Sequence, residues 1–296
     1  MKKHLSGIII FLIFVLGVGI MLYPVLSDYV NRRHSSKVIT EYHSFIEGLD
    51  SEKLRKDVEE AEEYNQTLAK TPDAFYKPWL IEGYHQTLNI TGTGIMGYIS
   101  IDKIGVELPI YHGVEQEVLQ IGVGHLPGTS FPVGGSSTHA VLSGHRGLPS
   151  AKLFTDLDRL EVGDSFTITI HDMELTYVID QVKIVLPTEA EDLKIEDGKD
   201  YCTLLTCTPY GINSHRLLVR GARGEKEPVS APKIYVANEA FQIEPWIVAI
   251  FILIPLVVIA FSFLAFLDYG DRKRRLKRLN KKLASMKKET QSDDEE

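Results

Sequence analysis

Two long apolar runs lie near the two ends of the chain. Leu5 to Leu26 and Pro245 to Leu267 contain no charged side chain. At about 1.5 Å per residue in a helix, each run is long enough to cross the core of a bilayer. Lys2 and Lys3 precede the first run, and ten Lys or Arg residues follow the second between Arg272 and Lys288. This excess of positive charge predicts that both ends are cytoplasmic and that residues 28–243 lie outside the membrane.

The first run is longer than the apolar part of a typical signal peptide. The residues that follow it, "YPVLSDYV", offer no cleavage site with two small residues one position apart. The sequence therefore favours an uncleaved anchor. The basic residues near the C-terminus are expected to lie against anionic membrane lipid.

Helical spacing of apolar residues follows the first run. One set is Val38, Tyr42, Phe45, Ile46 and Leu49, and a second is Leu54, Val58, Ala61 and Leu68. Asp50 or Ser51 is suited to cap the second helix, and Thr71 with Pro72 is expected to end it. Helices are therefore predicted over about residues 30–70.

After Thr91 the apolar residues alternate with a period of two, which is typical of strands. The alternating stretches lie at 99–110, 166–170 and 175–186, and "HAVLS", "YCTLLTC" and "RLLVRG" complete the set. The phase slips at "DKIG" and again after Ile179, which indicates turns or bulges. "SAKLFTDLDRL" has the spacing of a short helix. Many short strands with few helices predict a β-barrel or a β-sandwich.

These patterns divide the chain into seven segments. They are an N-terminal transmembrane anchor (1–27), extracellular helices (28–70), a lid or loop segment (71–92), a mainly β catalytic domain (93–225), a linker (226–243), a C-terminal transmembrane helix (244–267) and a basic cytoplasmic tail with an acidic end (268–296).

The charge of the extracellular part argues against nucleic acid as a partner. Between the two predicted cytoplasmic ends the chain has 20 basic and 33 acidic residues, whereas nucleic-acid-binding domains are typically basic. "GTGIMG" matches the dinucleotide motif G-x-G-x-x-G, but the strand-like "GYISI" follows it where a helix is required, so the match is attributed to chance. The motifs H-E-x-x-H, C-x-x-C, G-x-S-x-G and the P-loop are absent from the sequence.

The chain has two cysteines, Cys202 and Cys207, on one predicted strand. In a strand they lie about 16 Å apart, whereas a disulfide requires Cα atoms within about 7 Å. Cys202 lies in mid-strand and is expected to be buried. Cys207 ends the strand, before a turn at Thr208-Pro209-Tyr210-Gly211, so its thiol can be both held and exposed. A buried, unreactive cysteine remains the alternative for Cys207.

A reactive thiol requires a positive charge and a proton partner nearby. The strand that returns after the turn brings Arg216 towards Cys207. The candidate proton partners are His112, His125, His139, His145, His171 and His215. His145 lies just past a strand end, like Cys207, whereas His215 adjoins Arg216 and is expected on the opposite face. Spacing alone favours His145 only modestly.

"LSGHRGLPSAKLFTDLDRL" and "TLLTCTPYGINSHRLLVRG", together with "GYISIDKIGVELPIYHG" and "GVGHLPGTSFPVGGSSTHAV", resemble class C, pilus-assembling sortases. The resemblance covers about residues 30–225 and the layout with two anchors. It implies an eight-stranded β-barrel and a cysteine transpeptidase of Gram-positive type that uses no cofactor or metal. By the same resemblance, Cys207 is the nucleophile, His145 the acid/base and Arg216 the residue that stabilises the oxyanion. Arg220 shares the face of Arg216, but the family's arginine matches "SHR".

The resemblance also implies the reaction and the partners. Cys207 attacks an LPxTG-like sorting signal between Thr and Gly, and a lysine of the next pilin subunit then takes over the acyl group in an isopeptide bond. The partners are pilin precursors that bear such signals and an acceptor lysine. A wall-anchoring sortase, a cysteine protease with water as acceptor and a non-enzymatic membrane receptor remain alternatives.

Class C sortases also have a lid, usually Asp-Pro-aromatic, over the cysteine. Asp73 and Phe75 in "TPDAFYKPW" match it, and Ala74 stands where the family has proline. Asp73 is then expected to pair with Arg216, and Phe75 to cover Cys207. Pro78-Trp79 is a rival aromatic pair.

Overall fold

The computed structural model describes residues 2–224 and isolated positions between 255 and 280. The chain divides into two compact units: residues 1–23 with 243–296, and residues 24–242. The second predicted transmembrane run, the linker and most of the tail lie outside the described residues. Among those described, one helix, Ile13–Glu47, is long and apolar enough to cross a membrane. This supports the predicted N-terminal anchor.

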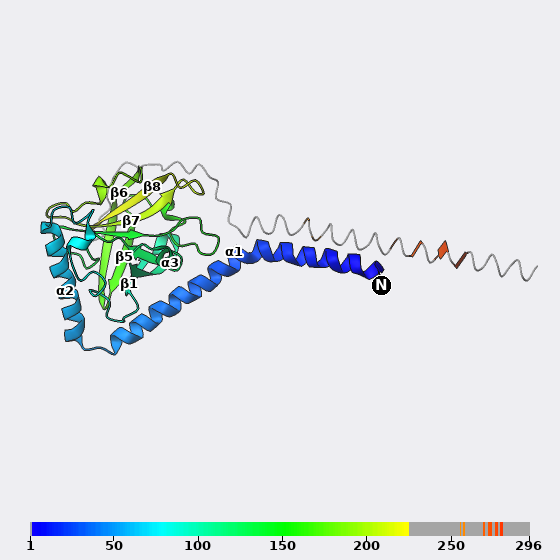
Figure 1. Cartoon of the computed structure of the whole chain (residues 1–296), viewed down its shortest axis with the longest axis horizontal. Helices are drawn as coiled ribbons and strands as arrows, with labels where there is room; N and C mark the ends of the chain where they lie inside the picture. Colours follow the sequence, from blue (N-terminus) through cyan, green and yellow to red (C-terminus); the bar gives the residue numbers. More distant parts are fainter. Residues whose placement is uncertain are drawn as a thin grey trace, which may run out of the picture. The chain divides into compact units, whose positions relative to one another are not determined.

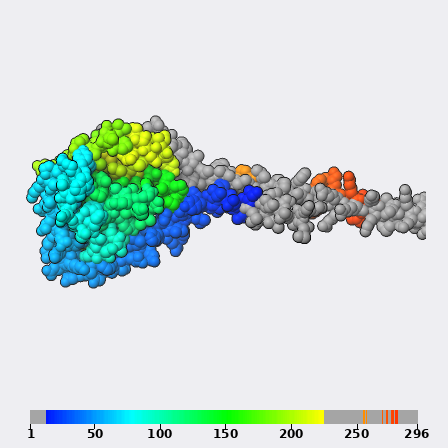
Figure 2. All heavy atoms as spheres, viewed as in Figure 1, coloured from blue at the N-terminus to red at the C-terminus, as the bar shows by residue number. Residues whose placement is uncertain are grey.

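Two helices precede the barrel: α1 (Lys2–Glu47) and α2 (Ser51–Lys70). The set of apolar residues from Val38 lies in the last part of α1, so the predicted helices over about residues 30–70 are confirmed, and the first of them is continuous with the N-terminal apolar run. Asp50 caps α2 as predicted, because its carboxylate accepts a hydrogen bond from Glu52 N at 3.1 Å. In Figure 1, α2 runs along one side of the barrel, and the cyan atoms of this region lie directly against the barrel in Figure 2.

The apolar face of α2 explains this position. Leu54, Ala61, Tyr64 and Leu68 are buried. Asn65 adds two hydrogen bonds to the backbone of Phe131, at 3.0 Å to its oxygen and 2.7 Å from its nitrogen. A buried amide that is bonded on both sides fixes the helix in register on the barrel.

Eight strands form a closed barrel in the order β1-β2-β3-β4-β7-β8-β6-β5. They are β1 (Ile95–Ile101), β2 (Val106–His112), β3 (Val123–His125), β4 (Thr138–Ser143), β5 (Ser165–Ile170), β6 (Met173–Val185), β7 (Asp200–Thr208) and β8 (His215–Arg223). The pairs β2–β3 and β4–β7 are parallel and the other pairs are antiparallel. The predicted eight-stranded, mainly β fold is confirmed.

Short helices connect the strands: α3 (Gln116–Leu119) and the 3₁₀ helices η2 (Asp102–Ile104), η3 (Leu157–Arg159) and η4 (Glu191–Leu193). A further 3₁₀ helix, η1 (Pro78–Leu80), lies between α2 and β1. The phase slip at "DKIG" is η2, which ends at Gly105 with φ +60°. The second slip is a bulge between Ile179 and Gln181 in the pairing of β6 with β8. Both predicted irregularities are therefore present.

Two local predictions were wrong or incomplete. "SAKLFTDLDRL" forms turns and η3 instead of an α-helix. Leu153, Phe154, Leu157 and Leu160 are all buried, so their spacing reflects burial by an irregular segment. The three-residue strand β3 was missed, because it is too short to show alternation.

The inner face of the barrel holds the main core, to which Cys202 belongs. A second cluster lies on the outer face of β4, β7, β8 and β6. We call it the outer apolar cluster: Val141, Val185, Leu193 and Leu218, with Phe75, Leu126 and Leu205 packed against it. It lies next to the candidate site.

Candidate active site

Cys207 and Arg216 lie directly opposite each other on β7 and β8. In an antiparallel pair such residues point to the same face, with Cβ atoms about 4.5–5.5 Å apart. The hairpin therefore brings a thiol and a guanidinium together on the outer face. Cys207 is half-buried, Cys202 is buried, and both are free thiols. Burial raises the pKa of the Cys202 thiol well above its usual value, which keeps that thiol unreactive.

His145 follows the end of β4, which pairs in parallel with β7 up to Ser143 and Leu205. The alignment continues past the strand end, because Gly144 N donates to Leu205 O at 3.0 Å and Thr206 Oγ1 donates to Gly144 O at 2.7 Å. One further step in this register aligns His145 with Cys207. Arg216 of β8 therefore lies on one side of the candidate thiol, and the loop that carries His145 follows β4 on the other side.

The His145 ring has the properties of a proton carrier. It is half-buried, and its Nε2 atom is buried without a hydrogen-bond partner among the described residues. Burial lowers the pKa of His145, which favours the neutral imidazole. A buried polar atom without a partner is uncommon in folded proteins and often marks a functional position.

The other candidate histidines are occupied elsewhere. Both ring nitrogens of His112, His125, His139 and His171 have hydrogen-bond partners inside the fold. His215 pairs across the hairpin with Thr208, bonds Ser214 Oγ at 2.9 Å and adjoins Arg216 along β8, so it points to the opposite face. Of the six candidates, His145 is the one that the fold leaves available at Cys207.

Arg216 and Arg220 differ in their partners. Arg216 Nη1 donates to the carbonyl oxygens of Asn213 and His215 at 3.3 and 3.1 Å, and no carboxylate pairs with it in the described part of the chain. Arg220 is paired with Asp180 and Glu196 and stacks over the Tyr201 ring at 4.1 Å. Among the described residues the Arg216 guanidinium therefore has no carboxylate partner, whereas that of Arg220 has two.

Residues 71–77, the first part of the predicted lid or loop segment (71–92), lie against the barrel on the same outer face; we refer to residues 71–77 as the lid segment. Phe75 packs against the outer apolar cluster, as does Leu205, two residues before Cys207 on the same face of β7. Ala74 is buried, and its N–H donates to Thr71 O at 3.3 Å, a bond that the family's proline cannot make. Gly128 allows the close approach, because a Cβ there would lie 2.6 Å from Phe75 O.

The predicted ion pair between Asp73 and Arg216 is absent. Lys77 Nζ lies 3.2 Å from Asp73 Oδ2 instead. The reason is local: the backbone turns between these residues, with Lys77 N bonded to Asp73 O at 2.9 Å, and this places their side chains together. The rival aromatic Trp79 is 73% exposed, so it covers nothing.

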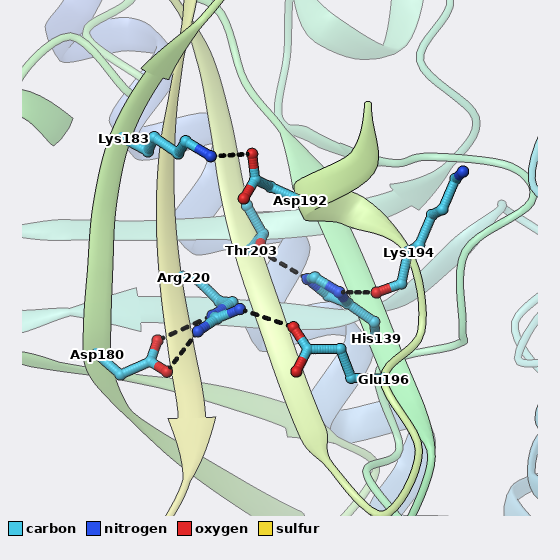
Figure 3. Close-up of polar contacts among 8 residues, drawn as sticks. All are labelled: His139, Asp180, Lys183, Asp192, Lys194, Glu196, Thr203 and Arg220. Carbon is cyan, nitrogen blue, oxygen red and sulfur yellow. Dashed lines mark hydrogen bonds and ion pairs between the residues drawn. The ribbon is translucent and has the colours of Figure 1, made fainter. Parts of the chain in front are cut away.

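The loop between β6 and β7, residues 186–199, is anchored to the barrel at alternate residues (Figure 3). Asp192 accepts a bond from Lys183 at 2.6 Å, the carbonyl of Lys194 accepts one from His139 Nδ1 at 2.9 Å, and Glu196 accepts one from Arg220 at 3.2 Å. Burial lowers the pKa of His139, so its neutral ring donates from Nδ1 and accepts at Nε2 from the Thr203 hydroxyl, 2.7 Å away. These anchors hold Leu193 in the outer apolar cluster.

The lid segment and this loop meet above the cluster. The Lys194 ammonium lies 5.3 Å from the centre of the Tyr76 ring. A cavity of about 230 Å³ lies between the two segments, lined on one side by Ala74, Phe75 and Tyr76 and on the other by Leu193, Lys194 and Ile195. The described residues contain no group of three or more His, Cys, Asp or Glu side chains placed to hold a metal ion.

Comparison with known proteins identifies the family. A family profile described as "Sortase domain" matches residues 99–224. The chain is 27% identical over 220 residues to sortase A of Bacillus anthracis, covering 74% of this chain and 95% of that protein. It is 32% identical over 130 residues to sortase D of Bacillus subtilis (strain 168), of which it spans 63%.

Solved structures give a closer match. The crystal structure of sortase C1 from Streptococcus agalactiae is 46% identical with a TM-score of 0.59, and the match covers 64% of this chain and 100% of that one. Sortase C of Streptococcus pneumoniae is 42% identical with a TM-score of 0.58, covering 66% and 99% of the two chains. The chain therefore belongs to the sortase family of cysteine transpeptidases, and its structural relatives are class C sortases.

Sequence reasoning missed two sets of residues near the site. The anchors of the β6–β7 loop come from three separate strands, β4, β6 and β8, and leave no local pattern. Arg146 and Asp158 form a buried ion pair behind the site. The position of Arg146, directly after His145, was the one available signal for this pair.

Proposed function

We propose that the chain polymerises pilin subunits. It cleaves an LPxTG-like sorting signal between Thr and Gly and joins the threonine to a lysine of the next subunit. The observation that carries this proposal is the pairing of Cys207 with Arg216 on β7 and β8, with His145 two residues past the end of β4, the strand that pairs in parallel with β7. A related structure supports the substrate class: sortase C of Clostridium perfringens, which is 44% identical to this chain, was solved with the C-terminal cell wall sorting motif.

The proposed reaction has two halves. His145 takes up the proton of the Cys207 thiol, the thiolate attacks the threonine carbonyl, and Arg216 stabilises the oxyanion that develops. His145 protonates the leaving glycine amine, which leaves a thioester on Cys207. The lysine amine then attacks the thioester, His145 takes up its proton, and the thiolate of Cys207 leaves as the isopeptide bond forms.

The outer apolar cluster suits the apolar part of such a signal. Leu205 and Leu218 are cross-strand partners one row from Cys207 and Arg216. A leucine and a proline of the signal can bury their side chains there while the threonine carbonyl reaches the thiol. Phe75 occupies this surface in the present structure, so the proposal includes that Asp73 and Phe75 belong to a lid that must move before the signal binds.

The proposed location is the cell membrane, with the catalytic domain extracellular and both termini cytoplasmic. The seven segments named from the sequence are the proposed domain organisation. The α1 helix supports the first anchor through its apolar residues, and the second anchor rests on the sequence of residues 244–267.

The test uses the full chain in detergent with a sorting-signal peptide and a lysine-containing acceptor peptide. Intact mass should show a thioester on the wild-type protein and a ligated product. Cys207→Ala should abolish both, whereas Cys202→Ala should retain both with a loss of stability of about 1 kcal/mol for the small cavity. If the Cys202 variant were the inactive one, the assignment would be wrong.

The same experiment separates the alternatives. A cysteine protease gives hydrolysed peptide and no ligation at any acceptor concentration. A wall-anchoring sortase ligates a cell-wall amine in preference to the pilin lysine. A non-enzymatic receptor forms no thioester and keeps its function after thiol blockade.

A further inference from the structure

A buried ion pair lies directly behind the candidate site. Arg146 follows His145 in the chain, and its guanidinium pairs with Asp158 of η3. The two side chains are only 3% and 2% exposed. Desolvating two charges so completely costs free energy that the attraction between them repays only in part. A pair at this depth therefore calls for an explanation other than stability.

The Arg146 guanidinium reaches a second segment as well. Its Nη1 atom donates to Thr208 Oγ1 at 3.2 Å, and Thr208 directly follows Cys207 on β7. The Arg146 side chain is thus bonded to the residue that follows Cys207, and the Arg146 backbone directly follows His145. Arginine suits this role, because its planar fork bonds two partners in fixed directions.

The segment around η3 supports the same loop from behind. Phe154 N donates to His145 O at 3.1 Å, and Gly147 N donates to Thr155 Oγ1 at 3.2 Å. Gly144 lets the Phe154 ring approach, since a Cβ there would lie 2.6 Å from that ring. The loop that carries His145 is therefore held in place by the segment around η3. Arg146 connects this segment to β7, because it pairs with Asp158 of η3 and donates a hydrogen bond to Thr208.

The pair is not arranged for stability alone. Arg146 Nε and Asp158 Oδ1 are buried and have no hydrogen-bond partner among the described residues. Such atoms carry a desolvation cost that an apolar replacement of the same shape would avoid.

We propose that Arg146, Asp158 and Thr208 are positioning residues that set the distance between the His145 imidazole and the Cys207 thiol. The inference rests on the proposed roles of those two residues. His145 lies beyond the end of β4 and Cys207 lies at the end of β7, so the ladder between the strands restrains neither side chain fully. The hydrogen bond from Arg146 to Thr208 supplies the missing restraint, because it links the residue after His145 to the residue after Cys207.

The decisive variant is Thr208→Val, which removes the hydroxyl and leaves the ion pair intact. In the full chain in detergent, kcat for ligation of a sorting-signal peptide should fall about 10- to 100-fold, as expected for a misplacement of up to 1 Å. KM should change less than about twofold, because the peptide surface is untouched. Thr208→Ser, which keeps the hydroxyl, should restore kcat. Arg146→Lys keeps the charge and loses the fork, and it should resemble Thr208→Val.

The matched control is Thr167→Val. This substitution also removes a hydrogen bond of a threonine hydroxyl, the one between Thr167 Oγ1 and Thr176 Oγ1 at 3.2 Å. These two residues lie on β5 and β6, away from the site. This variant should keep the kcat of the wild type. A loss of kcat in Thr208→Val that Thr208→Ser does not restore, or that Thr167→Val shares, would overturn the inference.

A second readout needs no sorting signal. The rate of Cys207 alkylation by iodoacetamide is measured in the Cys202→Ala background for His145→Gln, Thr208→Val and the double variant. Coupling through position predicts that His145→Gln slows alkylation less when Thr208 is already valine. Additive effects, or no effect of Thr208→Val on the alkylation rate, would refute the positioning role. Failure of the proposed function would appear differently, as a wild-type protein that forms no thioester while this coupling is still measured.

Discussion

Phe75 is the aromatic side chain through which the lid segment packs on the outer apolar cluster. Asp73 contributes little to this contact, because its partner is the neighbouring Lys77 and its side chain is 65% exposed. Residues 71–77 are therefore held on the barrel by apolar packing and by the fit of their backbone on Gly128. This differs from the arrangement expected from the sequence, in which an ion pair between Asp73 and Arg216 also stabilised the closed position.

Removing the Phe75 ring should expose the thiol. The packing of a partly buried phenylalanine contributes about 1–2 kcal/mol, which corresponds to roughly a 5- to 30-fold change in the population of the open lid. We therefore expect Phe75→Ala to raise the alkylation rate of Cys207 by that factor. Trp79→Ala and Asp73→Ala serve as controls and should leave the rate within about twofold of the wild type. Equal rates in Phe75→Ala and the wild type would show that this ring does not cover the site.

Gly128 offers an independent test of the same lid. Its φ is +85°, and an added Cβ would also collide with the lid backbone at Phe75 O. Gly105 has φ +60° and open space around its Cβ position, so Gly105→Ala imposes comparable backbone strain without a collision. Gly128→Ala should speed alkylation of Cys207, and Gly105→Ala should not. A similar rate in both variants would indicate that the lid does not rest on Gly128.

The β6–β7 loop forms one wall of the cavity beside the lid, and its position depends on side chains from three strands. Lys183 of β6, His139 of β4 and Arg220 of β8 each hold one residue of the stretch from Asp192 to Glu196 (Figure 3). Leu193 lies in the middle of this stretch and packs in the outer apolar cluster. The position of this cavity wall therefore depends on the three hydrogen bonds that hold the loop.

Loosening one anchor should weaken peptide binding more than chemistry. Arg220→Met removes the bonds to Asp180 and Glu196, and charged hydrogen bonds of this kind contribute about 1.5–3 kcal/mol when well sheltered. Because Glu196 is partly exposed, we expect KM for the sorting peptide to rise only about 3- to 10-fold, with kcat within about twofold. Lys103→Met, which removes a separate ion pair with Asp164, is the matched control. A fall in kcat at unchanged KM would contradict this role of the loop.

Buried histidines make the stability of the whole barrel unit depend on pH. The His125 ring is fully buried, with Nδ1 3.0 Å from Tyr84 Oη and Nε2 2.8 Å from Ser130 O. Burial lowers the pKa of His125 to about 4. Burial also lowers the pKa of His112, His139 and His145. The folded state thus binds fewer protons than the unfolded chain at mildly acidic pH.

The sign of the effect follows from linkage. The contribution of His125 is complete above the unfolded pKa of about 6.5 and is lost as the pH falls towards 4. Between pH 7.5 and 5.0 the free energy of unfolding should drop by about 2 kcal/mol from His125 alone. Urea unfolding at the two pH values measures this drop, and His125→Gln should reduce it by the same amount. An equal drop in the variant would mean that His125 is not its source.

Topology is a property of the full chain that the charge pattern predicts. Protease added to intact, wall-stripped cells should cut residues 30–240 and spare the tail after Asp268, because the basic flanks keep both ends inside. Tail cleavage should appear only after the membrane is permeabilised with detergent. Loss of the tail in intact cells would refute the proposed orientation.

The sequence predicted most of the barrel, because alternation of apolar residues reports a strand with one face in the core. It predicted β1, β2, β5 and β6 in this way, together with both phase slips and the cap of α2 at Asp50. The stretches "HAVLS", "YCTLLTC" and "RLLVRG" were predicted as further strands and are β4, β7 and β8. It failed at β3, which is too short, and at "SAKLFTDLDRL", where an irregular segment buries residues at helical spacing. In a short segment, a buried irregular chain and an amphipathic helix can show the same spacing of apolar residues, so spacing alone does not distinguish the two.

The sequence by itself determined the pairing of Cys207 with Arg216, because both lie in one hairpin and its register depends on a short turn. The burial of Cys202 followed from the same strand. Only the tertiary structure aligns His145 with Cys207, since this depends on parallel pairing of β4 with β7 across some sixty residues of chain. The same holds for the bond from Arg146 to Thr208 and for the anchors of the β6–β7 loop. In the lid segment, local structure overrode the expected tertiary contact. The turn between Asp73 and Lys77 places their side chains together, so Asp73 does not form the ion pair with Arg216 that the resemblance implied.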